Sequence, residues 1–140
     1  MARYIERSLS GPLEPCLATY EDGLAALDRD ARAEFNRGFL ELGAERQDRI
    51  LARAELGLPS SSTSDVAEFF ELLRTHVIEG MFGDPRHGGN AGLVGWRLIG
   101  YSGPRLSVVA DDQQLDTPSD PEIKSIDDIE FFVQARHRSR

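Results

Sequence analysis

Apolar residues recur at helical spacing in several separate segments of this 140-residue chain. The clearest pattern predicts an amphipathic helix that follows a polar linker at residues 60–64 and ends near Gly80. Negative charge from Asp65 and Glu68 falls in the first turn of this helix, where the helix dipole favours it. Its apolar positions, at i, i+3, i+4, i+7 and i+11, are Val66, Phe69, Phe70, Leu73 and Val77.

Weaker patterns predict further helices nearer the N-terminus. Thr19 and Asp22 have the spacing of a helix-opening capping box. Residues 30–42 also show helical spacing, which predicts a helix there. Another helix is predicted over residues 44–56, with Gly57 as its terminator. The apolar positions that define the segment 30–42 are Phe35, Phe39 and Leu42.

Two short helices are predicted in the second half of the chain. Asn90 is suited to be the N-cap of a helix that starts at Ala91, and apolar residues continue over 93–99. Near the C-terminus, Ser125 and Asp128 have the spacing of a capping box for another short helix. The apolar positions of that last helix are Ile126, Ile129 and Val133.

The ends of the chain differ in composition from its middle. Residues 1–18 contain Gly11, Pro12 and Pro15, and they predict an extended N-terminal arm. Residues 105–140 are rich in aspartate and proline and predict an extended C-terminal arm with one short helix. The sequence therefore predicts a mainly α protein: a small helical domain over 19–104 that carries a Gly-rich loop, with an arm at each end.

The most informative stretch runs from Glu79 to Asn90 and contains four glycines and one proline. Glycines such as Gly83, Gly88 and Gly89 allow positive φ or the close approach of another backbone. Ordering such a segment costs much conformational entropy, which is unusual for a simple connector. We interpret it as a shaped loop that leads into an apolar helix.

This stretch also resembles a known family. The order Gly-Met-Phe-Gly-Asp-Pro-Arg-His-Gly-Gly-Asn, followed by Gly-Trp-Arg-Leu-Ile-Gly-Tyr, is similar to the signature of the gluconate 2-dehydrogenase subunit 3 family. The resemblance is strongest over residues 79–104 and extends more loosely back to Tyr20. One position departs from the pattern: the family usually has tyrosine where this chain has His87.

The resemblance implies an accessory role. Members of this family are small subunits of dehydrogenases that oxidise sugars and sugar acids, and the large subunit is a flavoprotein of the glucose-methanol-choline (GMC) type. The resemblance implies that FAD and the catalytic residues belong to that partner, with no cofactor in this chain. It also implies that residues of the Gly-rich stretch form the loop and a surface for the partner: Gly83, Asp84, Pro85, Arg86, His87, Gly88, Gly89, Asn90, Trp96 and Tyr101. Beyond the resemblance, the C-terminal arm has clustered apolar groups and little to bury them, so we expect Phe131 and Phe132 to contact the partner as well.

Other interpretations of the polar residues stay open at this point. Asp84, Arg86 and His87 could serve a free-standing enzyme, but we favour a structural role in which Asp84 accepts hydrogen bonds from backbone amides of a proline-containing turn. His76 and Glu79 could contribute to a metal site, although we expect His76 to make a hydrogen bond near the Gly-rich loop instead. A third possible role for the whole chain is that of a chaperone or export factor for the large subunit.

The remaining candidates carry less information. The glycine spacing fits neither nucleotide-binding fingerprint, so we expect no bound nucleotide at Gly88 and Gly89. Trp96 could be a core residue or could lie at a subunit boundary, where tryptophan is enriched. The single cysteine, Cys16, excludes an internal disulfide, and we expect no metal site.

Charge and hydropathy exclude some classes of partner. The net charge of −8 argues against binding to nucleic acid, which requires a basic surface. No apolar stretch approaches the roughly 18 residues that span a membrane, so we expect no direct membrane insertion. The N-terminus lacks the apolar core of a signal peptide. The chain could thus be cytoplasmic, a mature exported form, or a protein that is exported together with its partner.

Overall fold

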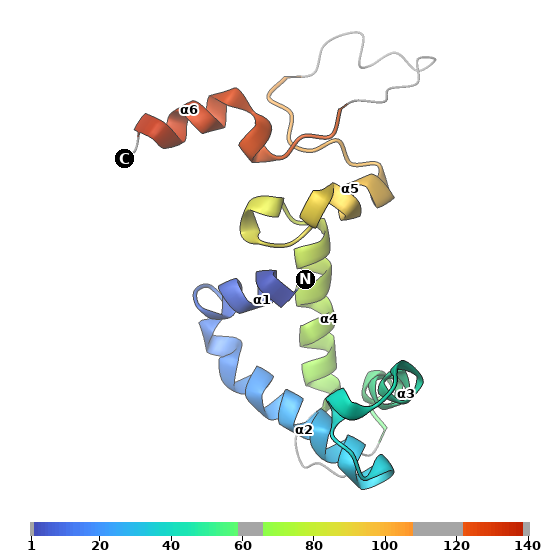
Figure 1. The fold of residues 1–140 in the computed structure, drawn as a ribbon. Helices are drawn as coiled ribbons and strands as arrows, with labels where there is room; N and C mark the ends of the chain where they lie inside the picture. The colour runs from blue at the N-terminus through green and yellow to red at the C-terminus, as the bar shows by residue number, and fades with distance from the viewer. Residues whose placement is uncertain (1, 59–65, 108–121, 139–140) are drawn as a thin grey trace. The chain divides into compact units, whose positions relative to one another are not determined.

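The computed structural model describes residues 2–58, 66–107 and 122–138. These residues form α-helices and short 3-10 helices without a strand, which confirms the predicted mainly α class (Figure 1). The α-helices are α1 (Ala2–Leu9), α2 (Leu17–Phe35), α3 (Ala44–Glu55), α4 (Val66–Phe82), α5 (Val94–Ile99) and α6 (Glu130–Arg138). The 3-10 helices are η1 (Glu14–Cys16), η2 (Phe39–Glu41), η3 (Pro85–His87), η4 (Ala91–Leu93) and η6 (Ile126–Asp128).

Backbone contacts divide the chain into two compact units. One unit comprises Met1–Arg7 together with Ile78–Arg140, and the other comprises Ser8–Val77. The division passes within α1 and within α4, and the helical domain at 19–104 stays a prediction. The Gly-rich loop, α5 and α6 all belong to the first of these units, which therefore holds most of the candidate site.

Aromatic packing between α2 and α4 forms the centre of the unit Ser8–Val77. The ring of Phe69 is 2% exposed and meets the ring of Tyr20 edge-on, with 5.5 Å between their centroids. A Cβ atom at Gly23 would overlap the Phe69 ring, so glycine is needed there for α2 to approach α4 this closely. Such packing explains why the apolar stripe of α4 was the clearest pattern in the sequence.

A buried hydrogen bond adds a polar contact to the same seam. The Tyr20 hydroxyl lies 2.8 Å from Nδ1 of His76, and both side chains are buried. We expected His76 to make a hydrogen bond near the Gly-rich loop. The partner that the structure gives it is Tyr20 on α2, within the unit Ser8–Val77.

Ion pairs and ring contacts attach α3 to the end of α2. Arg49 and Arg53 both pair with the carboxylate of Glu34, at 2.8 Å each. The guanidinium carbons of Arg46 and Arg49 lie over the Phe35 ring, at 5.2 and 5.9 Å from its centroid. The polar residues of α3 thereby help to hold its buried face, which includes Ile50 and Ala54, toward the core.

Two predicted segments are corrected by the structure. Ala2–Leu9 is α-helical, where the glycine and proline content of residues 1–18 had predicted an extended arm. The segment 30–42 is not one helix, because α2 continues from Leu17 to Phe35 and ends at Asn36, which has φ +54°. Phe39 then lies in η2, with its amide donating to the Asp28 carboxylate.

Other predicted helices are confirmed. Helix α3 covers Ala44–Glu55, and Gly57 follows it with φ +59°. Helix α4 extends two residues beyond the predicted end at Gly80. Ser125 and Asp128 form the expected capping box, although they cap η6 and α6 follows it. The aspartate-rich stretch at 108–121 lies outside the described residues.

Candidate functional site

The Gly-rich loop caps the C-terminal end of α4. A helix leaves its last four carbonyl groups without partners in the helix itself. Here the amide of Gly83 donates to the carbonyl oxygen of Glu79 at 2.7 Å, and the amide of Asn90 donates to that of Gly80 at 2.8 Å. The indole nitrogen Nε1 of Trp96 donates to the carbonyl oxygen of Phe82 at 2.6 Å. Residues of the signature thus donate hydrogen bonds to most of the free carbonyl groups at the end of α4.

Asn90 connects this helix end to α5. The residue is 2% exposed, and its backbone has φ +42°, a conformation that asparagine tolerates better than most residues. Its Nδ2 donates to the carbonyl oxygen of Gly83 at 3.1 Å, and its Oδ1 accepts from the amide of Gly95 at 2.8 Å. Asn90 does occupy the N-cap position before Ala91, but its side chain makes no capping bond there and reaches the start of α5 instead.

Two glycines let the loop and α5 lie directly against the end of α4. A Cβ atom at Gly89 would overlap the carbonyl oxygen of Gly80, and one at Gly95 would overlap that of Met81. The close backbone approach expected at Gly89 is confirmed. The positive φ expected of a glycine in this loop is found at Gly88, where φ is +95°. These glycines are therefore required by the shape of the cap.

Asp84 anchors the C-terminal segment to the loop. Its Oδ1 accepts from the amide of Arg86 at 3.0 Å, which is the turn-capping role that we favoured from sequence. Its Oδ2 accepts from the amide of Ile126 at 2.8 Å, across 42 residues of sequence. A second attachment lies nearby in sequence, where the amide of Lys124 donates to the carbonyl oxygen of Ser102 at 3.1 Å.

Arg86 and His87 have exposed side chains. The carbonyl oxygen of Arg86 accepts from Nη1 of Arg7, at 3.1 Å, so the loop is also tied to α1. Within the described residues, no hydrogen bond or ion pair joins the side chains of Asp84, Arg86 and His87 to one another. The three residues considered for a free-standing enzyme therefore do not form a connected acid–base group.

Trp96 and Tyr101 complete the surroundings of the cap. Trp96 is 3% exposed, and its ring meets that of Tyr101 edge-on with 5.0 Å between centroids. Trp96 is thus a core residue of its unit, whereas 44% of Tyr101 is exposed. Beyond them, Phe131 and Phe132 contact each other edge-on on α6, and Phe131 is exposed.

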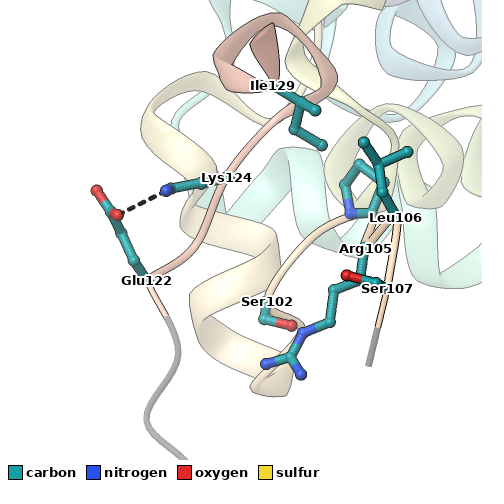
Figure 2. Close-up of a pocket in the computed structure, with 8 residues that line it drawn as sticks. Ser102, Arg105, Leu106, Ser107, Glu122, Lys124 and Ile129 are labelled. Atoms are coloured by element: carbon teal, nitrogen blue, oxygen red, sulfur yellow. Dashed lines mark ion pairs between the residues drawn. The ribbon is translucent and has the colours of Figure 1, made fainter. Parts of the chain in front are cut away.

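An open hollow of about 350 Å³ adjoins the segment after α5 (Figure 2). Figure 2 shows Lys124 turned toward Glu122, with which it forms an ion pair at 2.9 Å. The lining combines charges of both signs with hydroxyl and apolar groups, and it has no feature that selects one class of ligand. Its residues are Ser102, Pro104, Arg105, Leu106, Ser107, Glu122, Lys124 and Ile129.

Neither a cluster of metal ligands nor a membrane-spanning helix occurs in the described part of the chain. Across residues 2–58, 66–107 and 122–138, no three histidine, cysteine, aspartate or glutamate side chains gather as a metal site would require. Glu79, considered with His76 as a metal ligand, instead accepts a hydrogen bond from the Tyr4 hydroxyl at 3.0 Å. Over the same ranges, no helix combines the length and the apolar character needed to cross a membrane.

The comparison with protein families agrees with the sequence signature. The profile of the family described as gluconate 2-dehydrogenase subunit 3 matches residues 1–103. This match covers α1 to α5 and the whole capping loop, and it reaches further toward the N-terminus than the resemblance noted from sequence. Neither a curated protein nor a solved structure gave a match to the chain.

Proposed function

Because this chain belongs to the gluconate 2-dehydrogenase subunit 3 family, we propose that it is a non-catalytic accessory subunit of an FAD-dependent dehydrogenase. The partner is a large flavoprotein of the GMC type, which oxidises a sugar, a glycoside or a sugar acid. The hydride from the substrate passes to FAD in that partner. The small subunit stabilises the flavoprotein and contributes no reacting group.

The observation that carries this proposal is that polar side chains of the signature form hydrogen bonds with the backbone of this chain. A catalytic carboxylate needs an oxygen that can reach a substrate, within about 3 Å of the atom that carries the proton to be moved. In Asp84 each carboxylate oxygen already accepts a backbone amide, one from Arg86 and one from Ile126. Asn90, which is the buried polar residue of the loop, uses its side-chain amide to bond to Gly83 and Gly95. These two residues of the signature, Asp84 and Asn90, thus have a structural role in holding the loop.

Co-purification tests the proposed assembly. The chain is co-expressed with a GMC-type flavoprotein large subunit from the same source, and only the small chain carries an affinity tag. We expect a stable complex with a fixed stoichiometry, burying on the order of 2,000 Å² or more. A chaperone or export factor would instead be released once the flavoprotein had matured, and persistent failure to form a complex would refute the accessory role.

The location of the flavin provides an independent test. The tagged chain is purified alone and its absorbance is measured in the flavin bands, before and after incubation with FAD. We expect no bound flavin, since the glycine spacing of the loop lacks the dinucleotide fingerprint. One equivalent of flavin retained by this chain through gel filtration would show that the cofactor has been assigned to the wrong subunit.

A further inference from the structure

Helix α5 presents apolar side chains on its outer side as well as on its inner side. Trp96 and Gly95 are buried against the end of α4. Four other apolar side chains within eight residues are exposed, and we name them the α5 face. They are Val94 (60% exposed), Leu98 (70%), Ile99 (58%) and Tyr101 (44%).

The outer side of α5 departs from the usual pattern of a surface helix. Such a helix normally carries polar residues opposite its buried stripe. Val94 and Leu98, four positions apart, are neighbours on the helix surface, and both are highly exposed. The only charged residue of α5 is Arg97. A cluster of exposed apolar groups bordered by polar ones is typical of a protein–protein contact.

The α5 face is also held in place before any partner binds. Asn90 fixes the start of α5 through the amide of Gly95, and Trp96 fixes its middle through the carbonyl oxygen of Phe82. Binding to a surface that is already ordered avoids much of the entropy cost of association. The capping loop therefore serves to present this face.

The stretch of sequence that contains α5 differs in charge from the whole chain. The chain carries a net charge of −8, yet no aspartate or glutamate occurs between Asp84 and Asp111. The same stretch contains three arginines, which are Arg86, Arg97 and Arg105. Arg97 lies on α5 itself, so this helix carries positive charge and no negative charge beside its apolar groups, which is complementary to an apolar recess bordered by carboxylates. In a symmetric dimer the α5 face would meet the same face of a second copy and bring Arg97 against Arg97, so a second copy is a poorer match.

We propose that the α5 face is the surface on which the flavoprotein large subunit docks. The partner presents an apolar recess with an acidic border, and Leu98, as the most exposed member of the face, inserts into that recess. This inference rests on the proposed function, and it adds which surface makes the contact. The face lies within the family match at residues 1–103, as a contact common to the family requires.

The test compares two substitutions at equally exposed leucines. Leu98→Glu changes the α5 face, whereas Leu56→Glu changes a leucine in the unit Ser8–Val77 that is also 70% exposed. Each tagged variant and the wild-type chain are titrated with the purified flavoprotein, and the dissociation constant is measured. We expect Leu98→Glu to weaken binding by about 30-fold or more, the effect of losing an interface hot spot. Leu56→Glu should bind within about twofold of wild type, as expected for a residue outside the interface.

Additional measurements keep the outcomes distinct. The urea midpoint of Trp96 fluorescence shows whether Leu98→Glu still folds, and Leu98→Ala repeats the test without an added charge. Equal binding by wild type and both Leu98 variants would refute the α5 face while leaving the accessory role intact. If the wild-type chain does not bind the flavoprotein, the proposed function and this inference both fail. Loss of a wild-type homodimer in Leu98→Glu, with flavoprotein binding unchanged, would assign the face to a second copy.

Discussion

Replacement of Gly89 by alanine tests whether the signature loop works through its shape. The added Cβ atom would overlap the carbonyl oxygen of Gly80, which belongs to the backbone of α4 and cannot rotate away. Gly89 itself does not have a positive φ, so steric overlap and not backbone strain is the perturbation. The loop must therefore move away from the helix end, and the cap must open at this point.

The size of the effect follows from the bonds at risk. The nearest is the hydrogen bond from the amide of Asn90 to the carbonyl oxygen of Gly80, at 2.8 Å. The bond from Asn90 Nδ2 to the carbonyl oxygen of Gly83, at 3.1 Å, moves with it. A buried polar group that is left without a partner costs about 1–3 kcal/mol. Two such bonds are at risk, and Gly→Ala recovers about 0.4–1 kcal/mol through the unfolded chain, so we expect a net loss of roughly 1–5 kcal/mol.

Urea unfolding followed by Trp96 fluorescence measures this loss. Trp96 is the only tryptophan, it is buried, and it donates to the same helix end, so its emission reports on the unit that contains the cap. Gly92→Ala is the matched control, because Gly92 lies in the same region with φ +66° but a Cβ atom added to it would meet no other atom within 4 Å. The left-handed backbone conformation alone should lower the free energy of unfolding of Gly92→Ala by about 1–2 kcal/mol. A Gly89→Ala variant as stable as Gly92→Ala, or more stable, would refute the steric argument.

Three further predictions concern single side chains. Tyr20→Phe should destabilise the unit Ser8–Val77 by about 1–3 kcal/mol in thermal unfolding, because buried His76 loses its hydroxyl partner; an unchanged melting temperature would contradict this. Hydrogen bonds from the Ser125 hydroxyl and, to a smaller extent, from the Ser125 amide lower the pKa of Asp128. The ionised Asp128 carboxylate therefore stabilises the fold above about pH 3.8, and this stabilisation is lost as the pH falls below that value. The variant Asp128→Asn should lose less stability at acid pH than the wild type, which a pH titration monitored by circular dichroism would measure. His87→Tyr and His87→Ala should both keep sugar-dependent flavin reduction in the purified complex, and a loss of about 10²–10⁴-fold, the scale of general acid–base catalysis, would contradict a non-catalytic His87.

Local patterns in the sequence predicted the helices better than their ends. The stripe of α4 and the limits of α3 follow from apolar spacing and from Gly57, which are local features. The end of α2 was missed because helical spacing continues from Phe35 to Phe39 while the backbone turns at Asn36. That turn is stabilised by Asp28, which accepts from the amide of Phe39 eleven residues further along. A side chain contact of this kind is not visible in hydrophobic periodicity.

The same distinction applies to the candidate site. The capping role of Asp84 toward its own turn could be predicted, because the bond spans two residues. Its bond to Ile126 spans 42 residues and depends on how the C-terminal segment folds back. The hydrogen bond of His76 could be expected from sequence but its partner could not, since Tyr20 lies 56 residues away in sequence. Glycine, asparagine and tryptophan in the signature indicated a constrained structure, but not which atoms impose the constraint.

The structure separates two parts of the signature that the sequence presents as one. Gly89, Asn90 and Trp96 form the inner part, and their contacts are with the end of α4. Substitutions there should act on folding first and on assembly only as a consequence. Leu98 belongs to the outer part, where the side chain is exposed and contributes little to the fold of this unit. A selective loss of flavoprotein binding with unchanged stability is therefore expected only from the outer part, and the paired measurements on Gly89→Ala and Leu98→Glu would show whether fold and recognition separate along this line.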